Sequence, residues 1–281
     1  MRTLVGGVVA AASLVVIPPV FAQSPTGTWN GLTDRFQIDT GYFRITAVAI
    51  LRYNGPQGGS GQIDFTKDLG ENDSVNTFWV DGTWRVGRRH QLKLAFTRSS
   101  QTGTDHTLQR DFSWGGETYS AGLTANSSTS SDILAGYYRF AAFRNERFEI
   151  GPTIGFGYLW LKAEIQATGT VSTPGGSESR TLDASASTGS VTGAFGGYAN
   201  AWPAKRLALR GDFLYIKLSP GDSTGSVTDW RLAADYYFFP NAGLGAQYKY
   251  YKYTYDRGIV ASQLGGELTF KGFQVFLSFL F

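Results

Sequence analysis

The sequence has 281 residues, of which 15% are aromatic, 36 are Gly and only 17% are charged. The absence of Cys excludes a disulfide framework, a thiolate metal site and a lipid-modified N-terminal Cys. A net charge of +3 is too small and too dispersed to indicate nucleic-acid binding. Abundant aromatic residues and Gly predict an all-β chain, and the length fits a single domain.

The first 22 residues have the pattern of a secretory signal peptide. Arg2 supplies a basic start, residues 4–17 form an apolar core, and Val20-Phe21-Ala22 precedes a predicted cleavage site before Gln23. An N-terminal membrane helix is the alternative, but Pro18-Pro19 interrupts the apolar run and no basic flank follows it.

From residue 42 onward, apolar and polar residues alternate in segments of about ten residues, which is enough for a tilted strand to cross a bilayer. The first segment has a predicted lipid-facing row at Phe43, Ile45, Ala47, Ala49, Leu51 and Tyr53. Arg44 and Arg52 fall on its other face. Further alternating segments follow at 78–86, 92–97, 134–140, 148–158, 191–202, 207–215, 230–238, 244–250 and 261–281.

The connections between these segments alternate in length. Short turns are predicted at 87–89, 144–147, 203–205 and 240–241, and longer polar loops at 54–74, 98–131 and 166–188. Short periplasmic turns and long extracellular loops are typical of outer-membrane barrels. Aromatic residues near the strand ends predict a periplasmic girdle formed by Trp84, Phe140, Phe148, Trp202 and Phe238.

The last nine residues are F-Q-V-F-L-S-F-L-F. This ending resembles the C-terminal signature of Gram-negative outer-membrane β-barrels, which the barrel-assembly machinery recognises. The positions that match the signature, and that we predict to be the assembly signal, are Phe273, Leu277, Phe279 and Phe281.

The segment just before this ending has its apolar row on even positions. That row comprises Leu264, Gly266, Leu268 and Phe270, whereas the final row uses odd positions. A β-bulge at Lys271 and Gly272 is therefore predicted, because one extra residue shifts the alternation by one position.

The resemblance implies an all-β fold, a single antiparallel transmembrane β-barrel over residues 36–281 after a periplasmic lead-in at 23–35. We predict about ten strands with both termini periplasmic, and eight or twelve strands are the alternatives. The chain is similar in pattern to the small OmpA/OmpW-type barrels. The implied location is the outer membrane, reached through the general secretory pathway after cleavage behind Ala22. The implied partners are outer-membrane lipid, lipopolysaccharide, the barrel-assembly machinery and an extracellular ligand held by the loops.

Charged residues on the interior faces predict a polar lumen. The predicted lumen charge network comprises Arg44, Asp81, Arg85, Arg139, Glu149, Arg210, Asp212, Arg231, Asp235, Lys249 and Glu267, with Arg52 and Lys93 on the same faces. Enclosed charges should pair, because an unpaired buried charge is costly. A structural network that fills the lumen is the main prediction. A narrow passage for small anionic solutes is the alternative, since basic residues outnumber acidic ones in this set.

The sequence gives little support for catalysis, and we expect neither a cofactor nor a metal ion. The chain has two histidines, His90 and His106. Asp105 precedes His106, but neighbours on a strand point to opposite faces and are poorly placed for a dyad. A lipid-modifying or proteolytic enzyme is thus the weakest alternative. The Ser/Thr/Asn-rich loop at 98–131, with Trp114 and Tyr119, favours a structural or surface-interaction role.

Overall fold

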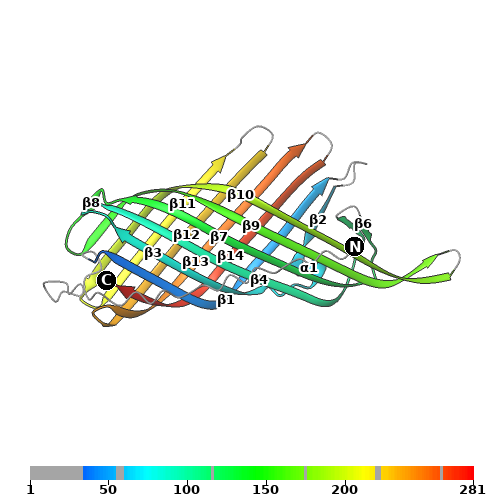
Figure 1. Ribbon diagram of the computed structural model, residues 1–281, viewed down its shortest axis with the longest axis horizontal. Helices are drawn as coiled ribbons and strands as arrows, with labels where there is room; N and C mark the ends of the chain where they lie inside the picture. Colours follow the sequence, from blue (N-terminus) through cyan, green and yellow to red (C-terminus); the bar gives the residue numbers. More distant parts are fainter. Residues whose placement is uncertain (1–33, 55–59, 115–116, 174–175, 219–222, 260–261) are drawn as a thin grey trace, which may run out of the picture.

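The computed structural model describes residues 34–54, 60–114, 117–173, 176–218, 223–259 and 262–281. The predicted signal peptide at 1–22, and all but the last two residues of the predicted lead-in at 23–35, lie outside this part. Within it, the chain forms a closed antiparallel barrel of ten strands, as predicted (Figure 1). The barrel strands are β1 (Phe36–Asn54), β3 (Ser74–Arg85), β4 (His90–Thr107), β7 (Thr124–Phe140), β9 (Phe148–Thr173), β10 (Gly176–Ala204), β11 (Leu207–Leu218), β12 (Ser223–Phe239), β13 (Ala242–Ile259) and β14 (Ser262–Leu280).

Pairing of the first and last strands closes the barrel, with Ile38 opposite Phe279 and Ala49 opposite Leu268. The four short connections lie at the end where β1 begins and β14 finishes, which we call the turn end. One of them contains the short strand β8 (Phe143–Arg144), which pairs with β9. The opposite end, called the loop end, carries the two longest connections, residues 55–73 and 108–123 (Figure 1).

The wall alternates between exposed apolar and buried polar side chains, as a strand period of two requires. On β4, Leu94 is 67% exposed whereas its neighbour Lys93 is 7% exposed. On β14, Phe273 is 79% exposed whereas Gln274 is buried. Large exposed apolar residues of this kind occur on all ten strands. Such a band is what a barrel presents to lipid.

The long loop predicted at 166–188 is instead a strand pair. β9 runs to Thr173, β10 begins at Gly176, and Asp183 lies opposite Gln166. The Ser/Thr/Gly composition suggested a loop, but Ala167 and Leu182 alternate with polar residues and are buried. The two strands form a hairpin that reaches past its neighbours at the loop end (Figure 1).

The face prediction for β1 is wrong. Ile45, Ala47 and Ala49 are buried inside the barrel, whereas Ile38 and Tyr42, on even positions, are exposed. Apolar residues occupy both faces of this strand, because the loop-end half of the lumen is itself apolar. Alternation alone could not orient such a strand.

The bulge predicted at Lys271 and Gly272 is also absent. The ladder between β13 and β14 keeps a single register along its whole length, from Ala242 opposite Phe279 to Ile259 opposite Ser262. Leu268 and Phe270 therefore face the interior, where both are buried. The cause is the same apolar half of the lumen.

Two short elements close the loop end where the sequence predicted only a loop at 54–74. β2 (Ser60–Asp64) pairs with β1, and α1 (Phe65–Leu69) follows it. Asp64 caps the helix, since its Oδ1 accepts hydrogen bonds from the backbone N–H groups of Thr66 and Lys67, both at 3.1 Å. The helix packs Phe65 and Leu69 into the apolar half of the lumen.

The connection between β4 and β7 carries a small separate hairpin of β5 (Phe112–Trp114) and β6 (Glu117–Tyr119). The side chains of Trp114 and Tyr119 lie outside the described part. Where the structure describes the chain, no helix is long and apolar enough to cross a bilayer.

Candidate functional site

The turn-end half of the lumen holds a network of charged side chains, and Arg210 on β11 is its first centre. Its Nε and Nη2 donate to the two carboxylate oxygens of Asp235 at 2.7 and 2.6 Å. Its Nη1 donates to Asp39 on β1 at 2.5 Å. Three strands separate β1 from β11 on one side of the ring. Arg210 therefore ties two distant parts of the wall together.

Arg231 on β12 is the second centre. Its Nη1 donates to Asp81 on β3 at 2.8 Å, and its Nε and Nη2 donate to Asp212 at 2.9 and 2.6 Å. Asp81 also binds Lys93 at 2.8 Å, and Asp212 also accepts a hydrogen bond from Arg139 on β7. The chain of ion pairs thus runs across the lumen from β4 to β7 by way of β3, β12 and β11.

A third group surrounds Glu149 on β9, nearer the turn end. Its carboxylate accepts hydrogen bonds from Arg85 at 2.9 and 3.3 Å, from Gln91 at 2.5 Å and from Asn200 at 3.1 Å. Arg144 lies 3.7 Å away. Glu149 is completely buried, so these donors replace the water that a free carboxylate would bind.

The first two groups contain equal numbers of positive and negative residues. The acids are Asp39, Asp81, Asp212 and Asp235, and the bases are Lys93, Arg139, Arg210 and Arg231. All eight side chains are at most 11% exposed. The side chains of such an enclosed, matched set fill the lumen and hold the wall together. Because the charges are paired, they leave little net charge to attract an ion into the lumen.

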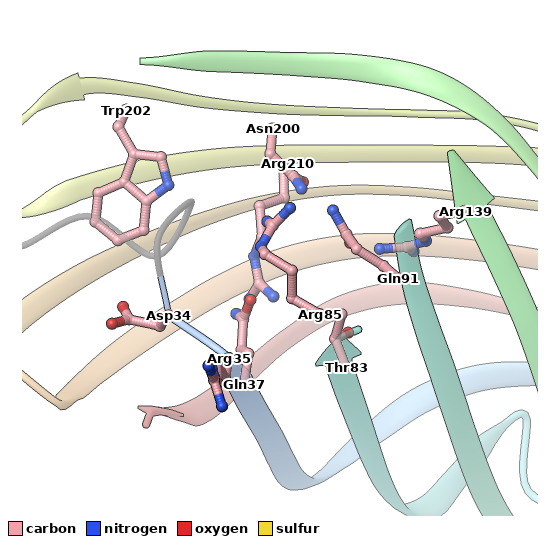
Figure 2. Close-up of a pocket in the computed structure, with 10 residues that line it drawn as sticks. All are labelled: Asp34, Arg35, Gln37, Thr83, Arg85, Gln91, Arg139, Asn200, Trp202 and Arg210. Atoms are coloured by element: carbon pink, nitrogen blue, oxygen red, sulfur yellow. The ribbon is translucent and has the colours of Figure 1, made fainter. Parts of the chain in front are cut away.

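Little open space remains where the lumen meets the turn end. Figure 2 shows Arg85, Arg210 and Gln91 extending toward one another from separate strands below Asn200. The cavity between them measures about 20 Å³, enough for roughly one water molecule. Trp202, predicted for the interfacial girdle, instead faces inward and stacks on Tyr237 with ring centroids 5.2 Å apart. At this end the lumen is filled by side chains.

The predicted network residues do not all lie together. Nine of them, Asp81, Arg85, Arg139, Glu149, Arg210, Asp212, Arg231, Asp235 and Lys249, are on inward faces. Lys249 stands apart from the two centres, 3.9 Å from Asp229.

Glu267 is not in the lumen network. It follows the outward parity of β14 and pairs with Lys252 at 2.8 Å and with Arg52 at 3.6 Å near the loop end. The misplaced bulge is the cause of this error. The side chain of Arg44 lies outside the described part.

Asp39 is the network member that the sequence interpretation missed. Its Oδ2 binds Arg210, and its Oδ1 accepts a hydrogen bond from Ser278 at 2.7 Å. The signal was present in the sequence, because Gln37 and Asp39 alternate with Phe36 and Ile38 at the start of β1. It was missed because the odd positions of β1, which include Asp39, were predicted to face lipid, whereas they face the lumen.

The two histidines lie away from this network. His90, at the turn end, places Nδ1 2.6 Å from the hydroxyl of Tyr138 on the exposed surface. His106, at the loop end, packs against Gly70 behind α1. Asp105 sits in a bulge with a φ of 52° and accepts no hydrogen bond from His106 that would form a dyad. Among the described residues, no group of three His, Cys, Asp or Glu side chains could hold a metal ion.

The predicted assembly residues share one outward face. Phe273, Leu277 and Phe281 are exposed, Phe279 is partly exposed, and the intervening Phe276 and Leu280 are buried inside the barrel. The amide of Phe281 donates to the carbonyl of Phe36 at 2.8 Å, so the end of the chain is paired with the start of β1.

Comparison with known proteins identifies the fold. Neither a protein-family model nor a curated protein matches the sequence. Among solved structures, the outer membrane protease OmpT from Escherichia coli is similar over 88% of this chain and 97% of that one, with a TM-score of 0.57 and 11% identity.

Two further structures match with lower scores. They are the outer membrane protein OprG from Pseudomonas aeruginosa, with 10% identity over 90% of this chain and 99% of that one and a TM-score of 0.38, and the attachment invasion locus protein Ail of Yersinia pestis, with 12% identity over 88% and 99% and a TM-score of 0.30. These lower scores do not establish a shared architecture. The likeness to OmpT shows that this chain has the fold of an outer-membrane β-barrel, and it shows the fold alone.

Proposed function

We propose that the protein is an outer-membrane β-barrel with a sealed lumen and a structural or surface-interaction role. The observation that carries the proposal is the matched set of four acids and four bases that crosses the turn-end half of the lumen. A barrel of about ten strands has an interior that side chains can fill, whereas open aqueous channels need many more strands. The paired charges fit a seal better than a conduit.

The proposed orientation places the turn end in the periplasm and the loop end outside the cell. The two longest connections, at 55–73 and 108–123, and the extended β9–β10 hairpin all lie at the loop end. They support this orientation, because bacterial barrels have short periplasmic turns and longer extracellular extensions. The exposed apolar band would contact outer-membrane lipid and lipopolysaccharide. Phe273, Leu277, Phe279 and Phe281 would present the assembly signal to the barrel-assembly machinery after the signal peptide is removed.

The loop end is where a surface partner would bind. The β9–β10 hairpin and the 108–123 connection extend from a rigid wall, and binding residues are often placed on such extensions. Catalysis is not part of the proposal, since His90 contacts Tyr138 on the exposed surface and His106 packs behind α1, both away from the charge network. An assay on lipid and peptide substrates would test this point, with His106→Ala as the control.

Single-channel recording of the refolded mature chain in a planar bilayer tests the seal. We expect no discrete conductance from protein whose folding is shown by its heat-dependent shift in electrophoretic mobility. Anion-selective steps that Arg210→Ala changes would overturn the proposal in favour of the alternative, a narrow channel for small anionic solutes. Arg98→Ala is the matched control, because Arg98 forms an exposed ion pair with Asp132 outside the lumen.

A further inference from the structure

The loop-end half of the lumen contains a cavity that the sealed-barrel proposal does not use. It measures about 190 Å³ and lies among β1, β9, β10, β13, β14 and α1. Its apolar wall is formed mainly by Ala49, Phe65, Leu159, Ala163, Tyr253 and Leu268. All six are buried, so the cavity is part of the interior.

A void of this size is unusual in a folded protein, because interiors are close-packed and contain few spaces larger than a water molecule. It is also unsuited to water, since a buried water needs two to four polar partners. The hydroxyl of Tyr253 already donates to Ser190 Oγ at 2.8 Å, which leaves the wall largely without free donors. An apolar cavity of about 150 Å³ stays dry and accepts benzene.

The cavity is closed toward the turn end. Tyr251 and Phe270 lie on that side with ring centroids 6.2 Å apart, followed by Lys249 and Asp229 and then by the charge network. Ser187 and Gly189 of β10 also line the pocket, and they are opposite Lys162 and Trp160 at the level of Leu159 and Ala163. The pocket therefore lies on the loop-end side of the charge network and offers no path to the turn end.

Helix α1 forms one wall of this pocket. Phe65 points into it, and the helix is held from outside by Arg110, whose Nη2 and Nε donate to the carboxylate of Asp68 at 2.5 and 3.1 Å. Glu71, just behind the helix, accepts hydrogen bonds from Gln101 at 2.5 Å and from Thr129 at 2.9 Å. The helix and the residues just after it are thus anchored to the strands β4 and β7 and to the connection that follows β4.

We infer that this pocket binds a small, neutral, aromatic or aliphatic molecule from the loop-end side. A charged ligand is disfavoured, because Glu267 is the one charged residue among the described lining residues and Lys252 and Arg52 already neutralise it. The volume admits a ligand somewhat larger than benzene. This inference is independent of the sealed lumen, since occupancy of the pocket does not depend on whether the barrel conducts.

Methyl NMR of the refolded protein in lipid nanodiscs, with ¹³C-labelled Leu methyl groups and indole as the probe, tests the inference. We expect saturable shifts at Leu159 and Leu268 in the pocket. Leu94 and Leu232, which are exposed on the outer wall, report indole dissolved in the lipid and should shift without saturation. Equal, unsaturated shifts at all four positions would overturn the inference.

Two Ala→Phe variants show where the probe binds. Ala163→Phe fills the pocket and should raise the dissociation constant of indole, measured from the saturable shifts, by about tenfold or more. Ala246→Phe introduces the same side chain on the exposed outer face and should leave the titration unchanged. If Ala163→Phe does not fold, Ala49→Phe fills the pocket from the opposite wall. A pocket-filled variant that folds and binds as the natural chain does would refute the assignment.

Discussion

Arg231 and Asp81 are 150 residues apart in the sequence, yet Arg231 Nη1 donates to Asp81 Oδ2 at 2.8 Å across the lumen. Neither residue is exposed, and each has a second ionic partner. Those second partners, Lys93 and Asp212, lie on neighbouring strands, so the contact between Arg231 and Asp81 joins two local ion pairs across the lumen.

Removal of the Arg231 side chain should therefore be costly. We expect Arg231→Ala to lower the free energy of unfolding by about 3–5 kcal/mol, because Asp81 and Asp212 would each lose a partner and four buried acids would face three bases. The matched control is Arg98→Ala, which removes an exposed pair with Asp132 and should cost about 0–1 kcal/mol. Urea unfolding in lipid vesicles measures both. Equal losses in the two variants would contradict the prediction.

Glu71 should make the α1 wall sensitive to pH. Burial raises its pKa from 4.5 to about 7, although hydrogen bonds from Thr129, Gln101 and Ser127 partly oppose that rise. The folded state therefore favours the protonated form of Glu71. The resulting stabilisation is fully present below pH 4.5 and is lost as the pH rises through 7, where the buried carboxyl ionises. The change across this window should be on the order of 3 kcal/mol at most.

Glu71→Gln removes the titrating group and keeps most of its size. The ratio of amide exchange protection in α1 between this variant and the natural chain should be near one at pH 5 and should favour the variant at pH 8. Hydrogen exchange followed by mass spectrometry measures this ratio. A ratio that does not change with pH would contradict the assignment of the switch to Glu71.

The register of β14 can be tested by spin labelling, since the chain contains no natural Cys. With one continuous register, a label at Thr269→Cys faces outward and one at Gln274→Cys faces the lumen. Collision with oxygen dissolved in the lipid should therefore be high at 269 and low at 274, with Val275→Cys as a lipid-facing reference. A bulge at Lys271 and Gly272 would make both labels inaccessible.

Gly70 should resist substitution for two separable reasons. It ends α1 with a φ of 66°, and a Cβ there would lie 2.5 Å from His106 Nδ1. Left-handed backbone costs about 1–2 kcal/mol for a residue with a Cβ. Gly122→Ala is the matched control, because Gly122 has a φ of 88° and open space around it.

We expect Gly70→Ala to raise the rate of limited proteolysis at α1. The increase should be larger than the one that Gly122→Ala, which adds backbone strain alone, causes around residue 122. Adding His106→Ala removes Nδ1 and Cγ but keeps a Cβ 2.8 Å from the new methyl group, so it should recover only the part of the loss that comes from the imidazole ring. If the double variant is cleaved as fast as Gly70→Ala, the contact with the ring of His106 is not the cause.

Much of the fold follows from the sequence because alternation constrains most strands. A strand can face only one way when its apolar and charged residues alternate. Leu92 and Leu94 face outward and Lys93 faces inward, and in the same way Leu232 faces outward and Arg231 inward. The turns at 87–89 and 240–241 follow from their composition in the same way. Ten strands are the result of counting these segments.

The errors share one physical origin. Where the lumen is apolar, Ile45, Ala47, Leu268 and Phe270 resemble lipid-facing residues, so alternation cannot tell the two faces apart. The charge network was only partly predictable for a related reason. Membership follows from strand parity, but the partner of each charge depends on barrel closure, which brings Asp39 to Arg210 and Asp81 to Arg231.

The trans-lumen pairs also constrain how the barrel can be completed. Asp39 lies on the first strand, while its partners Arg210 and Ser278 lie on the seventh and the last strands of the ring. In a partly assembled sheet, still open between β1 and β14, Arg210 would keep Asp235 on the neighbouring strand, but Asp39 would lie beside hydrocarbon without Arg210, which is energetically unfavourable. Correct closure supplies the partners of Asp39, so these contacts favour the finished barrel over mispaired intermediates and make the last step of assembly cooperative.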